Sequence, residues 1–306
     1  MKIAGIEIGG TKLQVVLGNE SGEIHDRVAH TIDASQGAAI IRGLIEGELK
    51  KFGKLDAVGV GFGGPVNRFT GEVWTSYHVK GWTGFNISGW LSEVTGSPVI
   101  LENDANTAAL GEAVWGAGSK HKIVFYVTVG SGVGGGLVVD RQIYHGRLPG
   151  EAEFGHIRLG VNGRILQDSC SGWAVNEKIR EKVVSGSGGI LAELAGQNKG
   201  IEAKALLPAI EAGDPDAIEI FDTTMTDLAF GLSHVAHLFH PDTIIIGGGL
   251  SFIGEPLRRQ VEDKMKVFIM DAFQPGPEVQ LSELKSDAVP VGALILAGQN
   301  INKSSN

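Results

Sequence analysis

Two glycine turns in the sequence have the composition of phosphate-binding loops. The first lies in GIEIGGTKLQVVLG and consists of Gly9, Gly10, Thr11 and Lys12; the second lies in VTVGSGVGGGLVV and consists of Gly130, Ser131 and Gly132. Glycines let backbone N–H groups approach an anion closely, and Lys12 adds a positive charge. A lone Gly-Gly pair is usually an ordinary β-hairpin turn, so the first stretch by itself leaves both interpretations open.

The two best-known phosphate motifs do not fit these glycines. Gly130, Gly132 and Gly135 have the spacing G-x-G-x-x-G, which binds dinucleotides only where it opens a helix. The residues that follow, GLVVDRQIYHG, are β-branched and interrupted by turn residues, so they predict a strand of a hairpin. The Walker loop fails because Gly53-Lys54 is followed by a leucine. Phosphate binding by the turns of β-hairpins is the interpretation that remains.

An aspartate lies at a predicted junction between a strand and a helix. The strand PVIL runs into Glu102, Asn103 and Asp104, and the helical pattern ANTAALGEAVWGA begins directly after them. Asp104 can be a simple N-cap there, which stabilises a helix by about 1 kcal/mol. A carboxylate at this place can also accept the proton of an attacking hydroxyl, while Asn103 donates to one substrate oxygen and accepts from another. Phosphoryl transfer needs such a base, in-line positioning and cations around the transferred group.

A third polar stretch, LPGEAEFGHIRLG, supplies Glu151, Glu153 and His156 between glycines. A carboxylate and an imidazole so close in sequence can bind a hydroxylated ligand. Solvated loop charges are the alternative, and the pattern by itself favours them.

Four short apolar runs predict the scaffold that must position these residues. They are KIAGIEI, DAVGVGF, KIVFYVTV and TIIIGGG, each rich in β-branched residues and bounded by glycines, and each predicts a buried strand. Helical patterns lie at residues 38–52, 105–115, 171–184, 217–239, 255–267 and 288–299. This alternation predicts an α/β fold with partly parallel sheets. The two turn-bearing segments share one plan of strand, glycine turn and second strand, which indicates either two lobes of related construction or chance similarity.

Composition and charge limit the class of protein. A chain of 306 residues with 42% hydrophobic and 20% charged residues has an ordinary soluble composition and room for two domains. Acidic residues outnumber basic ones 35 to 26, so neither nucleic acid nor an anionic membrane is expected as a partner. The single Cys170 excludes an internal disulfide, and no run of about 18 uncharged apolar residues is present to span a membrane. The sequence therefore indicates a cytoplasmic protein.

Five stretches in order along the chain resemble the motifs of one family. EIGGTK, LENDANTAALGE, VTVGSGVGGGLV, GEAEFGHIRL and IIIGGGLS are similar to motifs of the ROK family of sugar kinases and sugar-responsive repressors, within the actin, Hsp70 and hexokinase superfamily. The resemblance implies two RNase-H-like lobes of the actin-like ATPase type that close over a cleft, with ATP and Mg²⁺ on one side and a hexose on the other. We place the N-terminal lobe at residues 1–117 plus 287–306 and the C-terminal lobe at 118–286, because a helix ends at glycines near Gly116.

The resemblance also implies roles for individual positions. Asp104 matches the general base that activates a sugar hydroxyl, and Asn103 contacts the same sugar. Further sugar contacts are implied for Gly64, Glu153, His156 and Gln167, which for Glu153 and His156 replaces the solvated-loop interpretation. The phosphates are implied to lie at the two glycine turns, and the adenosine at Gly247, Gly248 and Gly249.

The chain departs from the family pattern at three places. Glu7 stands where most members have an aspartate near the metal; it keeps the charge, and we expect it to contact Mg²⁺. The cysteine-rich zinc loop is replaced by GVNGRILQDSCSGWAV, and because one cysteine and His156 cannot complete a four-ligand site, we expect no zinc. Gln167 stands where a sugar-binding glutamate is common. Its neutral amide can still hydrogen-bond hydroxyls, and its effect on affinity and substrate choice stays open.

These observations predict an ATP-dependent sugar kinase of glucokinase type that transfers the γ-phosphoryl group to a hydroxyl of glucose and, as is common in the family, forms a homodimer. Three alternatives stay open: an N-acetylated amino sugar or fructose as acceptor, polyphosphate as donor, and a sugar-binding regulatory protein without turnover. A DNA-binding repressor is not expected, since those members carry an N-terminal helix-turn-helix segment and the first predicted strand here begins near residue 3.

Overall fold

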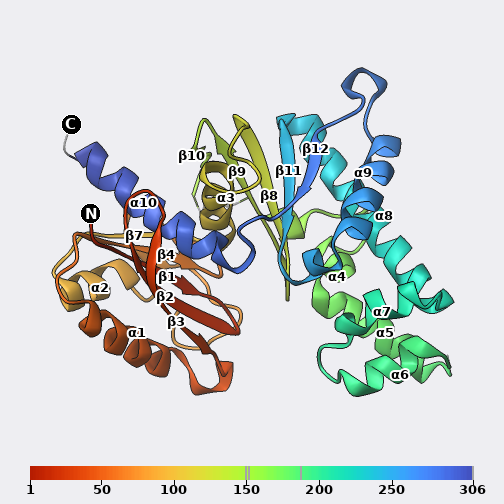
Figure 1. Ribbon diagram of the computed structural model, residues 1–306, viewed down its shortest axis with the longest axis horizontal. Coiled ribbons are helices and arrows are strands. Elements are labelled where there is room, and N and C mark those ends of the chain that lie inside the picture. The colour runs from red at the N-terminus through yellow and green to blue at the C-terminus, as the bar shows by residue number, and fades with distance from the viewer. Residues whose placement is uncertain (149, 151, 187, 305–306) are drawn as a thin grey trace. The chain divides into compact units, whose positions relative to one another are not determined.

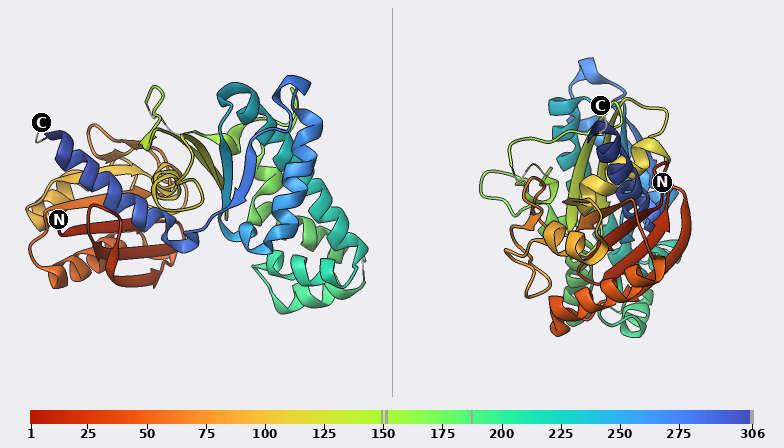
Figure 2. Two further views of the ribbon diagram at one scale, coloured as in Figure 1. Left: turned by 45° about the horizontal axis from the view of Figure 1, so that its top comes forward. Right: turned by 90° about the vertical axis from the view of Figure 1, so that its left-hand side faces the viewer.

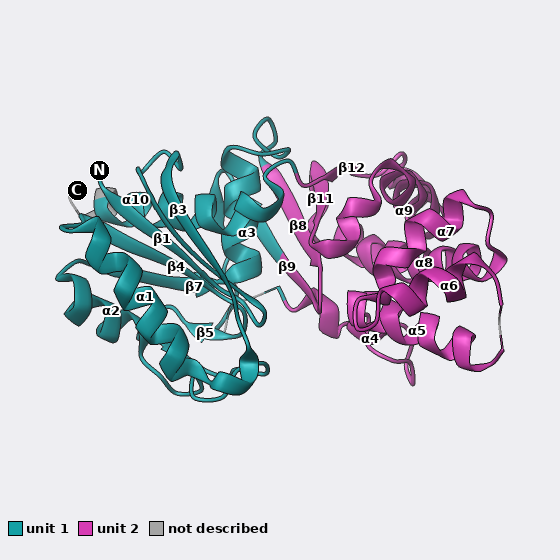
Figure 3. Cartoon of the chain, turned by 60° about the horizontal axis from the view of Figure 1, so that its bottom comes forward, with its two compact units in different colours: residues 1–122, 136–152, 283–306 teal, residues 123–135, 153–282 magenta. Residues whose placement is uncertain are grey.

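The computed structural model describes residues 1–148, 150, 152–186 and 188–304. They fall into two compact units, one drawn from residues 1–122, 136–152 and 283–306 and the other from residues 123–135 and 153–282 (Figure 3). Both units combine helices with strands, so the predicted α/β class is confirmed. Residues 136–152 belong to the first unit, whereas we predicted them in the C-terminal lobe. The two lobes stay a prediction.

The first unit is built on a five-stranded sheet with the order β3-β2-β1-β4-β7. Its strands are β1 (Ile3–Ile8), β2 (Lys12–Gly18), β3 (Ile24–Thr31), β4 (Ala57–Phe62) and β7 (Val99–Asn103). β1 and β2 form an antiparallel hairpin, whereas β4 and β7 run parallel to β1. Ile8 pairs with Phe62, and Phe62 pairs with Asn103, so the first turn, Gly63 and Asp104 follow these strands at one edge of the sheet.

Helices cover both faces of this sheet. They are α1 (Ala38–Phe52), α2 (Ile87–Thr95), α3 (Asp104–Val114) and α10 (Ala288–Ser304), and a short hairpin, β5 (Val66–Asn67) and β6 (Glu72–Val73), precedes α2. Along β4, Val58 and Val60 pack in one core cluster with residues of α1 and α2. Gly59 faces the opposite side, where an added Cβ would lie 2.0 Å from the Ala293 carbonyl oxygen, so only glycine lets α10 lie this close to the sheet (Figures 1 and 2).

The second sheet has the order β10-β9-β8-β11-β12. Its strands are β8 (Ile123–Val129), β9 (Val133–Val139), β10 (Gln142–Ile143), β11 (Thr243–Gly247) and β12 (Glu278–Leu281). β8, β11 and β12 are parallel and, with the first residues of β9, belong to the second unit. The helices of this unit are α4 (Gln167–Cys170), α5 (Gly172–Val184), α6 (Ile190–Gln197), α7 (Leu206–Glu211), α8 (Pro215–Phe239) and α9 (Glu255–Phe268).

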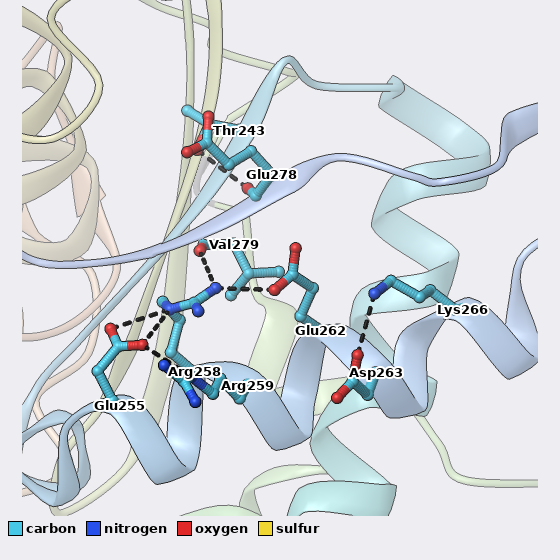
Figure 4. A network of polar contacts seen from close by, with 9 residues as sticks. All are labelled: Thr243, Glu255, Arg258, Arg259, Glu262, Asp263, Lys266, Glu278 and Val279. Carbon is cyan, nitrogen blue, oxygen red and sulfur yellow. Dashed lines mark hydrogen bonds and ion pairs between the residues drawn. The ribbon is translucent and has the colours of Figure 1, made fainter.

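Polar contacts hold β11, the strand that leads to a third glycine run, which consists of Gly247, Gly248 and Gly249. Arg258 on α9 donates through Nη1 to the Val279 carbonyl at 3.4 Å, which ties the helix to β12. The Thr243 hydroxyl donates to the Glu278 carbonyl at 3.0 Å, which ties β11 to β12 (Figure 4). β11 then ends in Gly247, the first residue of that glycine run.

The predicted elements are present with small changes at their ends. The four apolar runs are β1, β4, β8 and β11, and the six helical patterns are α1, α3, α5, α8, α9 and α10. α8 begins at Pro215, two residues before the predicted start, because Asp214 caps it and proline is favourable in the first turn. Among the described residues, no helix is both long and apolar enough to cross a membrane.

Candidate active site

The first glycine turn closes the β1–β2 hairpin. The Gly9 N–H donates to the Lys12 carbonyl at 2.9 Å, and the Gly63 N–H donates to the Ile8 carbonyl at 2.8 Å. The turn is therefore held against the end of β4. The imidazole of His78 lies against Gly10, where an added Cβ would be 2.9 Å from His78 Cγ. The hairpin is confirmed, while phosphate binding at this turn stays a prediction.

The charged residues of the first turn are paired with each other. Lys12 Nζ lies 3.2 Å from Glu7 Oε2. Gln14 stands opposite Glu7 in the hairpin, and its Nε2 donates to the same oxygen at 2.6 Å and to the Ser286 carbonyl at 2.8 Å. No sequence motif singles out Gln14, although its place opposite Glu7 follows from the hairpin register. Glu7 thus partly neutralises the charge of Lys12.

The donor set around Glu7 fits a magnesium ion that is held mainly by phosphates. Among the described residues, both side-chain contacts of Glu7 use Oε2, which leaves Oε1 as the oxygen able to face a metal ion. Mg²⁺ is commonly bound by one or two carboxylates together with substrate phosphates and waters. The described part of the chain contains no group of three or more histidine, cysteine or acidic residues able to hold a metal ion.

Asn103 is the N-cap of helix α3, and Asp104 is the first helical residue. The Asn103 Oδ1 accepts from the backbone N–H groups of Ala105 at 2.8 Å and Asn106 at 3.1 Å. The alternative in which Asp104 is the N-cap is therefore wrong, because the extended backbone that a cap requires occurs at Asn103. Asp104 Oδ1 accepts from the Ala105 N–H at 2.8 Å, and the negative charge in the first turn is favoured by the helix dipole.

The Asp104 carboxylate lies beside the first turn. A Cβ added at Gly63 would be 3.3 Å from Asp104 Oδ2 and 3.5 Å from the Gly9 Cα. Asn103 is close as well, and its Nδ2 donates to the Gly64 carbonyl at 3.3 Å. Because two backbone groups occupy its Oδ1, Asn103 has only an amide donor left to offer to a ligand, which narrows the predicted role of this side chain.

The second glycine turn is held by a helix start and a glutamine. The Gly130 N–H donates to the Gly132 carbonyl at 2.9 Å, and the Gly172 N–H at the start of α5 donates to the Gly130 carbonyl at 2.7 Å. Gln167 Oε1 accepts from the Val133 N–H at 3.1 Å. Gly130 itself has open space within its unit, since the nearest atom to an added Cβ is 4.0 Å away. Ser131 is exposed at the tip of the turn.

The predicted sugar loop is anchored by an aromatic side chain between its two polar residues. Phe154 is buried, and its ring lies 5.6 Å from that of Phe125. Gly155 packs on β9, where an added Cβ would be 2.2 Å from the Val133 carbonyl oxygen. Glu153 and His156 flank this anchor and are both exposed, with Oε2 and Nε2 3.9 Å apart. Glu151 lies outside the described residues.

The third glycine run has two glycines that packing requires and one that it does not. A Cβ at Gly247 would lie 2.2 Å from the Tyr126 hydroxyl, and one at Gly248 would lie 2.6 Å from the Val129 backbone. Gly248 also has a φ of +81°, which favours glycine. Nothing lies within 4 Å of a Cβ added at Gly249, so Gly249 is the member of the run that stays open to a ligand.

The segment in place of the zinc loop is organised around a buried thiol and a lysine. Burial raises the pKa of the Cys170 thiol to about 12, so this thiol stays protonated, and metal binding requires a thiolate. Lys178 Nζ donates to the Ser169 carbonyl and to the Thr224 hydroxyl, both at 2.9 Å, and burial lowers the pKa of this amine. Protein groups thus join α4, α5 and α8 directly.

Each unit gathers a part of the predicted site. In the first unit, Glu7, the first turn, Gly64, Asn103 and Asp104 meet at one sheet edge. In the second unit, Val133 contacts both Gln167 and the loop that carries Glu153 and His156. Gly248 packs on Val129. These two valines flank the second turn in sequence, so the second unit gathers its predicted site residues around that turn.

Comparison with known proteins gives consistent results. The model of the ROK family matches residues 3–300. The chain is 33% identical to a glucokinase of Thermotoga maritima over 98% of each protein, and 30% identical to a glucokinase of Halalkalibacterium halodurans over 97% of this chain and 95% of that protein. The crystal structure of a ROK family glucokinase from Streptomyces griseus in complex with glucose and AMPPNP superposes with a TM-score of 0.85 at 29% identity, covering 98% of this chain and 100% of the other.

Proposed function

Since the chain belongs to the ROK family and is a sugar phosphotransferase, we propose that it transfers the γ-phosphoryl group of ATP to a hydroxyl of glucose. Two similar proteins of nearly the same length are glucokinases, and the structure with a TM-score of 0.85 is that of a glucokinase with glucose and AMPPNP. The observation that carries the proposal is the carboxylate of Asp104, fixed at the start of α3 beside Gly63 and the first turn.

In the proposed reaction, Asp104 accepts the proton of the sugar hydroxyl that attacks the γ-phosphorus. The fixed geometry of the helix start supports this role, because a general base must be held within hydrogen-bond reach of its proton. Asn103 donates through Nδ2 to a sugar oxygen. Gly64, Glu153, His156 and Gln167 are further proposed sugar contacts, and the exposed Glu153 and His156 offer a charged acceptor and an imidazole to hydroxyls.

The proposed phosphate contacts are the backbone N–H groups of the two turns together with Thr11, Lys12 and Ser131. The open space at Gly130 and Gly249 supports an approach of ATP to both positions. Glu7 would hold Mg²⁺ through Oε1. When bound, the ion would neutralise charge on the phosphates, and Lys12 would contribute further positive charge to the same end.

The wider setting is part of the proposal. We propose a cytoplasmic homodimer without zinc, with no nucleic-acid or membrane partner; the acidic composition supports the last point. The mass in solution tests the homodimer, and the metal content tests the absence of zinc. A content of one zinc per chain would contradict the proposal that the protein has no zinc site.

A coupled assay of ADP release tests the function. Purified protein is given ATP, Mg²⁺ and one of glucose, mannose, fructose, N-acetylglucosamine or N-acetylmannosamine. In a parallel series polyphosphate replaces ATP and the sugar phosphate is measured, because no ADP forms from this donor. We expect glucose to give the highest kcat/KM, and Asp104→Asn to lower kcat by about 10²- to 10⁴-fold, because general-base catalysis is lost. Asp26→Asn, on the exposed face of β3, is the matched control and should keep full activity.

Other outcomes separate the alternatives. A higher kcat/KM with an N-acetylated amino sugar or fructose would replace glucose as the proposed acceptor. Sugar binding by calorimetry without turnover above the Asp104→Asn level would favour a regulatory protein, for which the engagement of Glu7 with Lys12 is the supporting observation.

A further inference from the structure

A buried carboxylate lies directly behind the predicted catalytic residues. Glu102, the residue before Asn103 on β7, is 3% exposed. Its Oε1 accepts from the Asn103 backbone N–H at 2.8 Å and from the Asn106 Nδ2 at 3.0 Å. Glu102 therefore binds the N-cap of α3 on one side and the first turn of α3 on the other, with Asp104 between them.

One imidazole contacts the other oxygen of this carboxylate. His145 Nε2 lies 2.6 Å from Glu102 Oε2, and the two side chains are 23% and 4% exposed. The contact is a hydrogen bond when Nε2 carries the N–H, because a carboxylate oxygen accepts hydrogen bonds. His145 follows β10 and belongs to the same compact unit as Glu102. No local sequence pattern indicates this pair, because 43 residues separate its members.

The contact with His145 decides how Glu102 can be oriented. Both carboxylate oxygens are used, so a rotation of the group would break contacts on both sides at once. Without the imidazole, Oε2 would be a buried, charged oxygen that lacks a strong donor, and the carboxylate would turn to find one. That rotation would release the Asn103 N–H and move the residue whose side chain caps α3 and precedes Asp104.

We propose that His145 is a positioning residue for the phosphoryl transfer, which acts through Glu102 to hold the Asn103–Asp104 turn in place. The proposal rests on the proposed function, because it concerns the geometry of the same general base. It predicts that His145 affects the rate of the chemical step more than the binding of ATP, since no turn glycine or Lys12 is among the groups that Glu102 holds.

His145→Leu removes the donor and keeps an apolar side chain of moderate size. We expect kcat for glucose to fall by about ten- to a hundredfold, because small displacements of a catalytic group have effects of this order, while the KM for ATP changes by less than about twofold. His145→Gln keeps a donor that can reach a carboxylate, and we expect it to recover most of the activity. In a Glu102→Gln background, His145→Leu should cost little more, since two residues that act through one contact are not additive.

A second histidine provides the matched control. His25 on β3 also faces a glutamate, with Nε2 3.4 Å from Glu23 Oε2, but both side chains are exposed at 49% and 69%. His25→Leu removes the same kind of pair in the same unit without touching α3, and we expect unchanged kinetics. Thermal unfolding of each variant verifies that the measured activity belongs to folded protein.

A readout without turnover separates this proposal from the proposed function. Hydrogen exchange of the amides at positions 103, 105 and 106 should be faster in His145→Leu than in wild type and unchanged in His25→Leu. If wild type shows no sugar-dependent ADP release, the proposed function fails, while the exchange result still decides whether His145 holds the Asn103–Asp104 turn through Glu102. Unchanged exchange, unchanged kcat, or equal losses of kcat in His145→Leu and His145→Gln would each overturn the positioning role.

Discussion

The first glycine turn is supported by charged side chains, whereas the second is supported by neutral groups. At the first, Gln14 donates to Glu7, and Lys12 pairs with the same carboxylate. At the second, the amide oxygen of Gln167 accepts from Val133, and a backbone N–H from the start of α5 donates to Gly130. Similar hairpins in sequence thus have supports of different strength, because hydrogen bonds to charged groups contribute more than neutral ones.

The difference also concerns what each turn offers to phosphate. The first turn carries a cation, but Lys12 is already partly neutralised by Glu7, and Arg27 lies near the same network. There the Arg27 guanidinium lowers the pKa of Asp287, to which Lys12 also contributes. The second turn has no charged side chain and presents only backbone N–H groups and Ser131. In the proposed phosphate site, the first turn would therefore supply charge and the second would supply close backbone approach.

Gln14→Leu should have the largest effect on stability. The substitution removes two hydrogen bonds, one of them to a carboxylate, from a side chain that is 2% exposed. Lys12 Nζ is then the donor that remains for Glu7 Oε2 at 3.2 Å and for the Ser286 carbonyl at 3.4 Å. We expect the free energy of unfolding to fall by about 2–3 kcal/mol, measured by urea denaturation.

The exposed Gln36 provides the control for this change, since Gln36→Leu makes the same substitution at the surface. A loss for Gln14→Leu no greater than that for Gln36→Leu would show that the charged network does not support the first turn.

Gln167→Leu is the corresponding change at the second turn. It removes one neutral hydrogen bond to the Val133 N–H from a partly exposed side chain, so we expect a loss of about 1 kcal/mol in the same denaturation measurement. A loss as large as that of Gln14→Leu would remove the distinction between charged and neutral support.

Most of the elements were predictable from the sequence because their signals are local. β1 and α1, for example, follow from short apolar runs and helical spacing with adjacent glycines. The supports of the turns were not predictable. Ser286 is 272 residues from Gln14, and Gln167 is 34 residues from Val133, so only the folded chain brings them together.

The candidate site shows the same limit at the scale of one residue. The sequence placed a carboxylate and an amide at the start of α3, yet it assigned the possible cap to Asp104, whereas Asn103 is the cap. Asparagine and aspartate are nearly equal as caps, so composition cannot choose between neighbours. The backbone conformation decides, and in doing so it leaves the Asp104 carboxylate beside Gly63.

Gly10→Ala should lower the stability less than either Gln14→Leu or Gln167→Leu. The new Cβ would be 2.9 Å from Cγ of His78, which is an exposed side chain, so we expect a loss of about 0.5 kcal/mol that is smaller in the His78→Ala background. We expect the KM for ATP to rise in Gly10→Ala and to stay raised in the double variant, because the proposed phosphate contact needs the bare backbone. Recovery of ATP affinity in the double variant would mean that packing against His78 is the reason for glycine at this position.

The smallest effect is expected on the labelling of Cys170 by a thiol reagent when the first turn is weakened. The thiol is fully buried at the end of α4, the helix that begins with Gln167, and burial raises its pKa from 9.0 to about 12. The stability that this shift contributes is complete below pH 9 and is lost as the pH rises towards 12, where the unfolded thiol is already ionised.

At about pH 8 a thiol reagent should therefore react with Cys170 only after α4 opens. We expect Gln167→Leu to raise the rate of labelling about fivefold, in line with its loss of stability, and Gln14→Leu to leave the rate unchanged, since it weakens a support in the other unit. A greater acceleration by Gln14→Leu than by Gln167→Leu, in proportion to its larger loss of stability, would show that Cys170 reports global unfolding. The two turns would then share one cooperative transition despite their different supports.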